Sequence, residues 1–164
     1  MLIKLCFTVV ATAPNLQEID LSNCMPKMSA KDRNQFLDHL IFYLKGYGEN
    51  IKLLNFTHTI TDDYFLQQLS EIRKLKLRSL SLTYNGSIAD KKFGLLPLIA
   101  SQTSLEYLDI SESPAVEETI MIEICKYLTK LKYLNLRKCC HVTDYCVREI
   151  VKLENLEVSE HPFL

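Results

Sequence analysis

A short repeated pattern decides the fold, and its clearest copy is Leu131-Lys-Tyr-Leu134-Asn-Leu136-Arg-Lys-Cys139. Three apolar residues at positions one, four and six of the pattern precede a small polar residue at position nine. The other copies of the pattern begin at Leu16, Ile51, Leu77, Leu105 and Leu153. The six first residues lie 35, 26, 28, 26 and 22 positions apart. Internal similarity at such a period is the signature of a repeat architecture.

Each copy predicts a short strand that ends in a turn. Leu134 and Leu136 alternate with polar residues and point to one side, where they fill the inside of a coil that Leu131 closes. The residue at position nine, Cys139 in this copy, lies in the turn, where its side chain satisfies backbone groups or simply fits. Strands of successive coils pair in parallel, and the central steps fit the period of about 20 to 29 residues found in leucine-rich repeats. We therefore expect a right-handed α/β leucine-rich-repeat solenoid of about six repeats, with strands on the concave side.

Amphipathic segments between the strands predict helices on the convex side. Residues 30–45, 62–74 and 117–129 carry apolar residues at helical spacing. Ser29 with Asp32 resembles a capping pair, and Thr61-Asp62-Asp63 and Thr143-Asp144 mark two further helix starts with acidic first turns. A further helix is expected over about 2–13, ending before Pro14 because proline halts a helix.

The repeats resemble the cysteine-containing leucine-rich repeats of F-box/LRR proteins and of relatives of the antagonist-of-mitotic-exit type. Residues 131–150, LKYLNLRKCCHVTDYCVREI, carry the resemblance best, followed by residues 13–24 and the helix entry at 60–62. The family implies a substrate-recognition element of an SCF-type cullin ubiquitin ligase, docked through an F-box to a Skp-type adaptor. No F-box is recognisable, because its one candidate, residues 36–44, lies between two repeats. We expect residues 1–164 to form a single domain, to which the family would add repeats upstream of Met1.

The cysteines are compatible with two locations of the protein, secreted or intracellular. Their number is even, which in a secreted chain would suggest disulfides, and the start MLIKLCFTVVATA has some features of a signal peptide. However, Lys4 interrupts that apolar run, and Cys24 and Cys139 hold one repeat position several coils apart, too far for a bond. We therefore expect free, mostly buried cysteines and a cytoplasmic protein, with the nucleus as the alternative. The six cysteines are Cys6, Cys24, Cys125, Cys139, Cys140 and Cys146.

Composition and motifs argue against several functions. Nineteen basic and twenty acidic residues give a net charge of −1, so no basic field favours nucleic acid. No apolar run is long enough for a membrane span. No catalytic or phosphate-binding motif is present, and with four glycines the chain has little material for phosphate-binding loops. We expect no enzyme activity, no cofactor and no metal. Cys139 has a role in the repeat, and Cys125 and Cys146 fall on helices that need small apolar residues, so structural roles fit these cysteines better than a zinc site.

The polar side chains of the concave face are the candidate binding site. Residues that flank the inward apolar positions point outward, and neighbouring strands bring them into continuous rows. Tyr and Arg are enriched at binding hot spots, and solenoids bind through their concave surfaces. The candidate partner-binding residues are Tyr107, Tyr133, Arg137, Asn135, Asp109, Asp20 and Glu157. The sequence thus predicts a protein-binding scaffold whose partners include a Skp-type adaptor and a cullin if the resemblance holds; the alternative is a structural or assembly factor of a larger complex.

Overall fold

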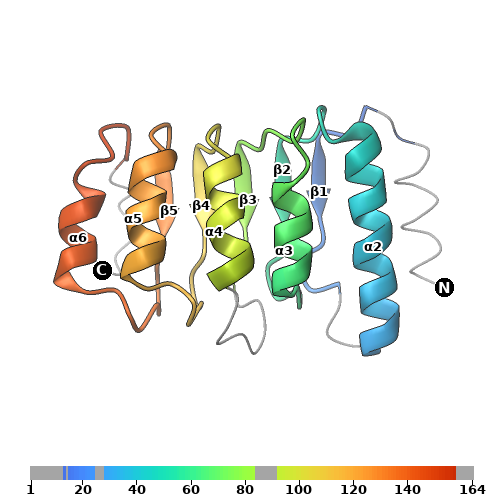
Figure 1. The fold of residues 1–164 in the computed structure, drawn as a ribbon, viewed down its shortest axis with the longest axis horizontal. Helices are drawn as coiled ribbons and strands as arrows, with labels where there is room; N and C mark the ends of the chain where they lie inside the picture. The colour runs from blue at the N-terminus through green and yellow to red at the C-terminus, as the bar shows by residue number, and fades with distance from the viewer. Residues whose placement is uncertain (1–12, 14, 25–27, 84–91, 158–164) are drawn as a thin grey trace.

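The computed structural model describes residue 13 and residues 15–24, 28–83 and 92–157. Within these residues, short strands alternate with helices along the chain (Figure 1). The strands are β1 (Glu18–Asp20), β2 (Leu53–Asn55), β3 (Ser79–Ser81), β4 (Tyr107–Asp109) and β5 (Tyr133–Asn135). The helices are α2 (Ala30–Tyr47), α3 (Asp63–Ser70), α4 (Lys92–Ser101), α5 (Glu118–Tyr127) and α6 (Asp144–Ile150). The expected helix over about 2–13 lies outside the described residues.

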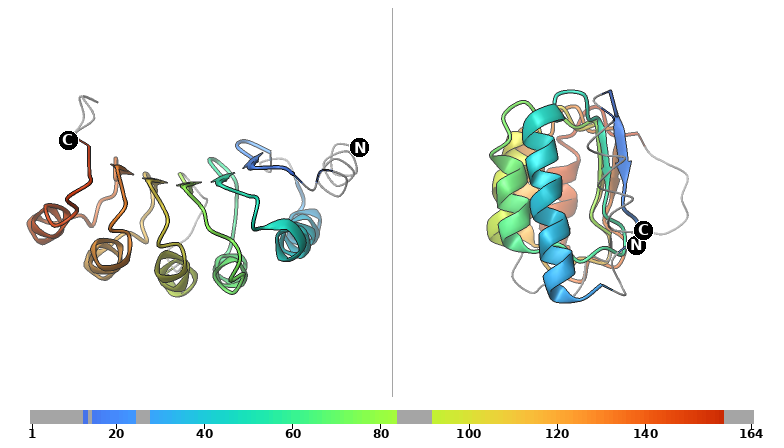
Figure 2. Two further views of the ribbon diagram at one scale, coloured as in Figure 1. Left: turned by 90° about the horizontal axis from the view of Figure 1, so that it is seen from above. Right: turned by 90° about the vertical axis from the view of Figure 1, so that its right-hand side faces the viewer.

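The strands form one parallel sheet in the order of the chain. The order is β1-β2-β3-β4-β5, and equivalent positions of the repeat face each other, as in the pairing of Leu54 with Leu80 and of Leu108 with Leu134. Seen from above, the helices form a bowed outer row and the strands a shorter inner row (Figure 2). The sheet therefore presents one face to the helices and its other, concave face to solvent, as the sequence predicts.

Buried and exposed side chains alternate along the strands, and this alternation distinguishes the two faces of the sheet. In β1 to β4 the central residue is buried and its two neighbours are partly or fully exposed. The central residues Ile19, Leu54, Leu80 and Leu108 join the helix side chains in one hydrophobic core. In β5, Leu134 is only partly buried, because no described strand covers it on the far side.

A recurrent turn follows each strand. The residue at position eight of the pattern has a positive φ in every copy whose turn is described: 57° at Asn23, 53° at His58, 56° at Glu112 and 59° at Lys138. At position nine, the buried Thr59 hydroxyl donates a 2.6 Å hydrogen bond to the Leu21 carbonyl of the preceding copy. The Cys139 thiol donates at 3.4 Å to the Ile110 carbonyl in the equivalent place. In these two copies position nine satisfies a backbone group, which is one of the two roles predicted for it; Asn85, its counterpart in the third copy, lies outside the described residues.

The helix starts follow the predicted capping residues, with one difference. The Ser29 hydroxyl accepts the Asp32 amide, and Asp62 accepts the Phe65 amide at 2.8 Å. Thr143 occupies the N-cap of α6, but its hydroxyl donates to Glu118 Oε1 on α5 instead of capping its own helix. The Thr143 hydroxyl therefore bonds to the neighbouring coil and not to the backbone amides of its own helix.

Other sequence expectations differ from the structure in detail. The helix expected over 62–74 ends at Ser70. α4, which contains Pro97, is one of the convex-side helices that the repeat implies, but the sequence did not predict its range. Of the described cysteines, which are all free, Cys140 is exposed rather than buried. It directly follows the turn residue Cys139, whose own side chain occupies the buried position.

The sixth copy of the pattern is only partly described. Leu153, its predicted first residue, is buried in the core, but the hydrogen bonds place the register three residues later. The Glu157 amide donates to the Lys132 carbonyl as the Lys132 amide donates to the Glu106 carbonyl, both at 2.8 Å. Glu157 therefore occupies position two of a copy that begins at Leu156, and it does not join the predicted row of Asp20 and Asn55. No strand is assigned in residues 153–157, and residues 158–164 lie outside the described part of the chain.

Candidate binding face

The register of β4 and β5 brings the two predicted tyrosines together. Tyr107 pairs directly with Tyr133, and their rings stack in parallel, with centroids 4.3 Å apart and planes inclined by 2°. Burial raises the pKa of Tyr107 to about 12, and Tyr133 and Asp109 act in the same direction. Tyr107 nevertheless keeps 37% of its surface exposed. The pair is a rigid aromatic surface that remains accessible to a partner.

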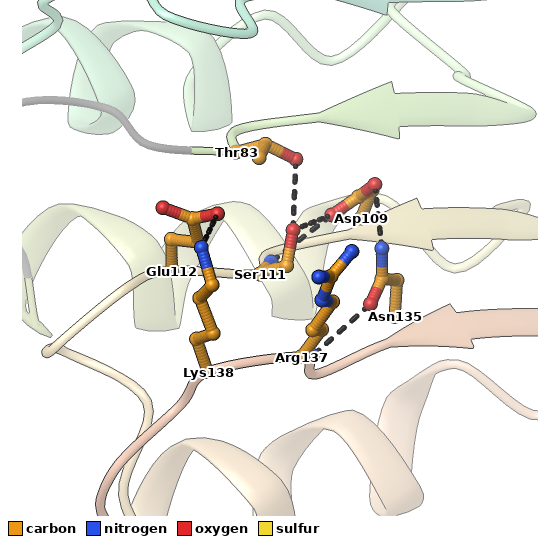
Figure 3. Close-up of polar contacts among 7 residues, drawn as sticks. All are labelled: Thr83, Asp109, Ser111, Glu112, Asn135, Arg137 and Lys138. Atoms are coloured by element: carbon orange, nitrogen blue, oxygen red, sulfur yellow. Dashed lines mark hydrogen bonds and ion pairs between the residues drawn. The ribbon is translucent and has the colours of Figure 1, made fainter. Parts of the chain in front are cut away.

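Beside the rings, polar side chains form a network across the strands (Figure 3). Asn135 Nδ2 donates to Asp109 Oδ2 at 3.0 Å, and the Ser111 hydroxyl donates to Asp109 Oδ1 at 2.7 Å. The Arg137 amide donates to Asn135 Oδ1 at 3.0 Å, while its guanidinium extends over the same face (Figure 3). Asp109 and Asn135 therefore have a structural role that the sequence did not predict: they hold the chain where it leaves the strand.

The same arrangement recurs at the other end of the sheet. The Ser22 amide donates to Asp20 Oδ1 at 2.8 Å, and Asn55 Nδ2 donates to Asp20 Oδ2 at 3.2 Å. Hydrogen bonds from Ser22 hold the pKa of Asp20 below its ordinary value. Asn55 in turn accepts the Thr57 amide at 2.9 Å. Each of these Asx residues thus accepts the amide two positions later, a standard use of short polar side chains in turns.

Hydroxyl groups link these two networks, and the sequence analysis did not single them out. The hydroxyl oxygens of Thr57 and Ser81 lie 2.7 Å apart, those of Ser81 and Thr83 lie 3.4 Å apart, and those of Thr83 and Ser111 lie 3.2 Å apart, all within hydrogen-bonding distance. A polar row therefore runs from β2 to β4. Its signal in the sequence is a small hydroxyl residue at position seven of successive copies, Thr57, Thr83 and Ser111, with Ser81 at position five between them.

Ion pairs border the concave face. At the start of the strands, Lys132 lies 2.9 Å from Glu106, and Arg78 lies 3.9 Å from the same carboxylate. Hydrogen bonding to Lys132 lowers the pKa of Glu106. At the opposite border Lys138 pairs with Glu112 at 2.8 Å (Figure 3). Each border thus has opposite charges in contact, with Glu106 shared by two cations and Glu112 paired with one.

The predicted site residues therefore fall into three groups. Tyr107, Tyr133, Asp109, Asn135 and Arg137 lie together on β4, β5 and the turns that follow them. Asp20 belongs to β1, at the opposite end of the sheet. Glu157 is exposed beyond β5, next to Lys132. Contact with a partner at these positions stays a prediction.

Two kinds of site are absent from the described part of the chain. No group of three or more His, Cys, Asp or Glu side chains is placed to hold a metal ion there. None of the helices found in that part of the chain combines the length and apolar character needed to cross a membrane.

Comparison with known proteins supports the fold. A solved structure of leiomodin-1 actin-binding site 2 superposes with a TM-score of 0.61 and 16% sequence identity, covering 93% of this chain and 87% of that chain. This similarity concerns the fold alone, and the chain therefore has an α/β, leucine-rich-repeat-like fold. No family model and no curated protein sequence matches the chain.

Proposed function

We propose that this chain is a protein-binding, right-handed leucine-rich-repeat solenoid of six coils, and that it is not an enzyme. The observation that carries the proposal is the stacked, partly exposed pair of Tyr107 and Tyr133 on the concave face. Aromatic side chains with fixed rings bury much area at little entropic cost when a partner binds. The leiomodin-1 fragment, described as an actin-binding site, illustrates that a chain of this fold can serve protein binding.

Arg137 extends the proposed contact surface beyond the rings. Its backbone is fixed by Asn135, and its guanidinium reaches over the concave face (Figure 3). Arginine and tyrosine are both enriched at interface hot spots. The partner therefore contacts β4, β5 and the turn after β5, while Asp109 and Asn135 keep this surface in shape.

The partner class within this proposal follows from the resemblance to F-box/LRR proteins. Residues 131–150 support a substrate-recognition element of an SCF-type cullin ubiquitin ligase acting in the cytoplasm or nucleus. An assembly factor that bridges a larger complex is the alternative. Co-purification separates the two, because only the ligase element recovers a Skp-type adaptor and a cullin.

The test is affinity purification of the tagged chain from its own cells, followed by mass spectrometry. A Tyr107→Ala/Tyr133→Ala variant and a separate Arg137→Ala variant are expected to lose partners that the wild type recovers. Phe93→Ala is the control, because Phe93 is 78% exposed on α4, on the helix side. Circular dichroism verifies that all variants fold. Identical partner sets for the wild type and the concave-face variants would refute the proposed contact surface.

A further inference from the structure

A groove of about 400 Å³ lies between α2 and α3, on the helix side of the molecule. Its apolar lining comes from Leu37, Ile41 and Phe42 on α2 and from Tyr64 and Phe65 on α3. These helices belong to the outer row, whereas the proposed partner contact uses the inner row of strands (Figure 2). The groove is therefore a separate surface from the one proposed above.

Two aromatic side chains that line the groove are unusually exposed. Leu37, Ile41 and Phe65 are at most 7% exposed and form part of the core. Phe42 is 80% exposed and Tyr64 is 63% exposed. Single exposed apolar residues are common on protein surfaces, but here two aromatic side chains, one from each helix, line a hollow whose lining is half apolar. A bulky apolar side chain entering this hollow would remove exposed surface of Phe42 and Tyr64 from water.

Charge distinguishes the two ends of the groove. The helices run in the same direction (Figure 1), so Asp38 and the helix cap Asp62 come before Lys45 and Gln68 along them. Lys45 Nζ donates to Gln68 Oε1 at 3.3 Å, which joins the helices at the far end. Asp38 and Asp62 are both exposed. The end of the groove at Asp38 and Asp62 is therefore negative and favours a cationic neighbour over an acidic or phosphorylated one.

We propose that this groove docks a peptide segment of a partner protein that inserts one bulky apolar side chain between Phe42 and Tyr64 and places a lysine or arginine near Asp38 and Asp62. The apolar anchor supplies the affinity, and the cation fixes the orientation of the segment. The chain then has two separate surfaces for protein contact, one on each side of the sheet.

The test uses a phage-displayed library of random 12-residue peptides, panned against the wild-type chain. Selected peptides are expected to share a large apolar residue with Lys or Arg close to it. A fluorescein-labelled copy of the dominant peptide is then titrated by fluorescence polarisation. Phe42→Ala is expected to weaken binding at least 10-fold, and Asp38→Asn about threefold at low salt, with less salt dependence than the wild type.

Matched controls keep the test specific. Phe93→Ala removes an equally exposed phenylalanine from α4, and Glu154→Gln neutralises an exposed carboxylate far from the groove; both are expected to bind like the wild type. Tyr107→Ala/Tyr133→Ala should also bind the peptide normally, since it alters only the concave face. The proposal is overturned if panning enriches no peptide, if the peptides lack basic residues, or if Phe42→Ala binds as well as the wild type. Self-association in sedimentation that Phe42→Ala abolishes would assign the groove to a second copy and overturn it too.

Discussion

At the residue scale, the small polar residue that ends the pattern has a defined role in two copies. Thr59 and Cys139 differ chemically, yet each donates from the same place to a carbonyl of the preceding copy. A hydroxyl and a thiol can both reach this carbonyl, whereas a larger side chain would not fit in the tightly packed turn. This explains why one copy has threonine and another has cysteine at position nine, both with small side chains.

We expect Thr59→Val to lower the free energy of unfolding by about 1 kcal/mol, the usual net value of one neutral hydrogen bond. The substitution keeps the shape of the side chain, and the Leu21 carbonyl still accepts the Cys24 amide at 3.1 Å, so the loss stays moderate. Urea denaturation measures the change. Thr103→Val, at an exposed site, is the control and should change stability by less than about 0.5 kcal/mol. Equal effects of the two substitutions would contradict the assigned role of Thr59.

At the element scale, close packing of α3 against α4 depends on a glycine. Gly94 is buried in α4, and its amide donates to Asp63 Oδ1 at 2.6 Å. A Cβ atom at Gly94 would clash with the Asp63 carbonyl oxygen and approach Leu66 Cβ to 2.9 Å. Gly46 in α2 is different, because a Cβ atom there meets nothing within 4 Å.

The two glycines therefore predict opposite effects of alanine. Gly94→Ala is expected to lower the free energy of unfolding by about 1–3 kcal/mol, because the helices must move apart. Gly46→Ala is expected to raise it by about 0.5–1 kcal/mol, since alanine is the better helix former. Thermal unfolding followed by circular dichroism measures both, at about 2–4 °C per kcal/mol for a chain of this size. A change in the same direction for both variants would contradict the packing of α3 on α4.

At the scale of the whole molecule, the strands differ in how well neighbouring strands bury their central residues. In β2, β3 and β4 the central leucine has neighbours on both sides and is at most 2% exposed. In β5 all three residues are only partly buried. Repeat proteins owe much of their stability to contacts between neighbouring coils, so a coil with less cover opens more easily.

We expect amide hydrogen exchange to follow this gradient. The amides of Phe56 and Leu82, which donate to the next strand at 2.8 Å, should exchange most slowly. The Ile110 amide, which donates to Asn135 of β5 at 3.2 Å, should exchange about tenfold faster or more. Exchange measured by nuclear magnetic resonance under native conditions tests this order. Uniform protection along the sheet would show that the described chain opens only as a single unit.

The sequence determined the repeat, the faces of the strands and the contact between the tyrosines. Alternation and a fixed period are local properties, and equal positions in successive copies must pair when the strands are parallel; Tyr107 therefore had to meet Tyr133. Helix starts at Ser29 and Asp62 were also readable, because capping depends on residues only a few positions apart.

The tertiary structure decided which polar atoms pair and which surfaces stay open. The bond from Asn135 to Asp109, the diversion of Thr143 to Glu118 and the hydroxyl row all depend on side-chain directions across coils. The groove between α2 and α3 depends on the distance between two helices, which no local pattern encodes. These features arise from packing between segments about 20 or more residues apart, and such packing selects among alternatives that are equally compatible with the sequence of each coil.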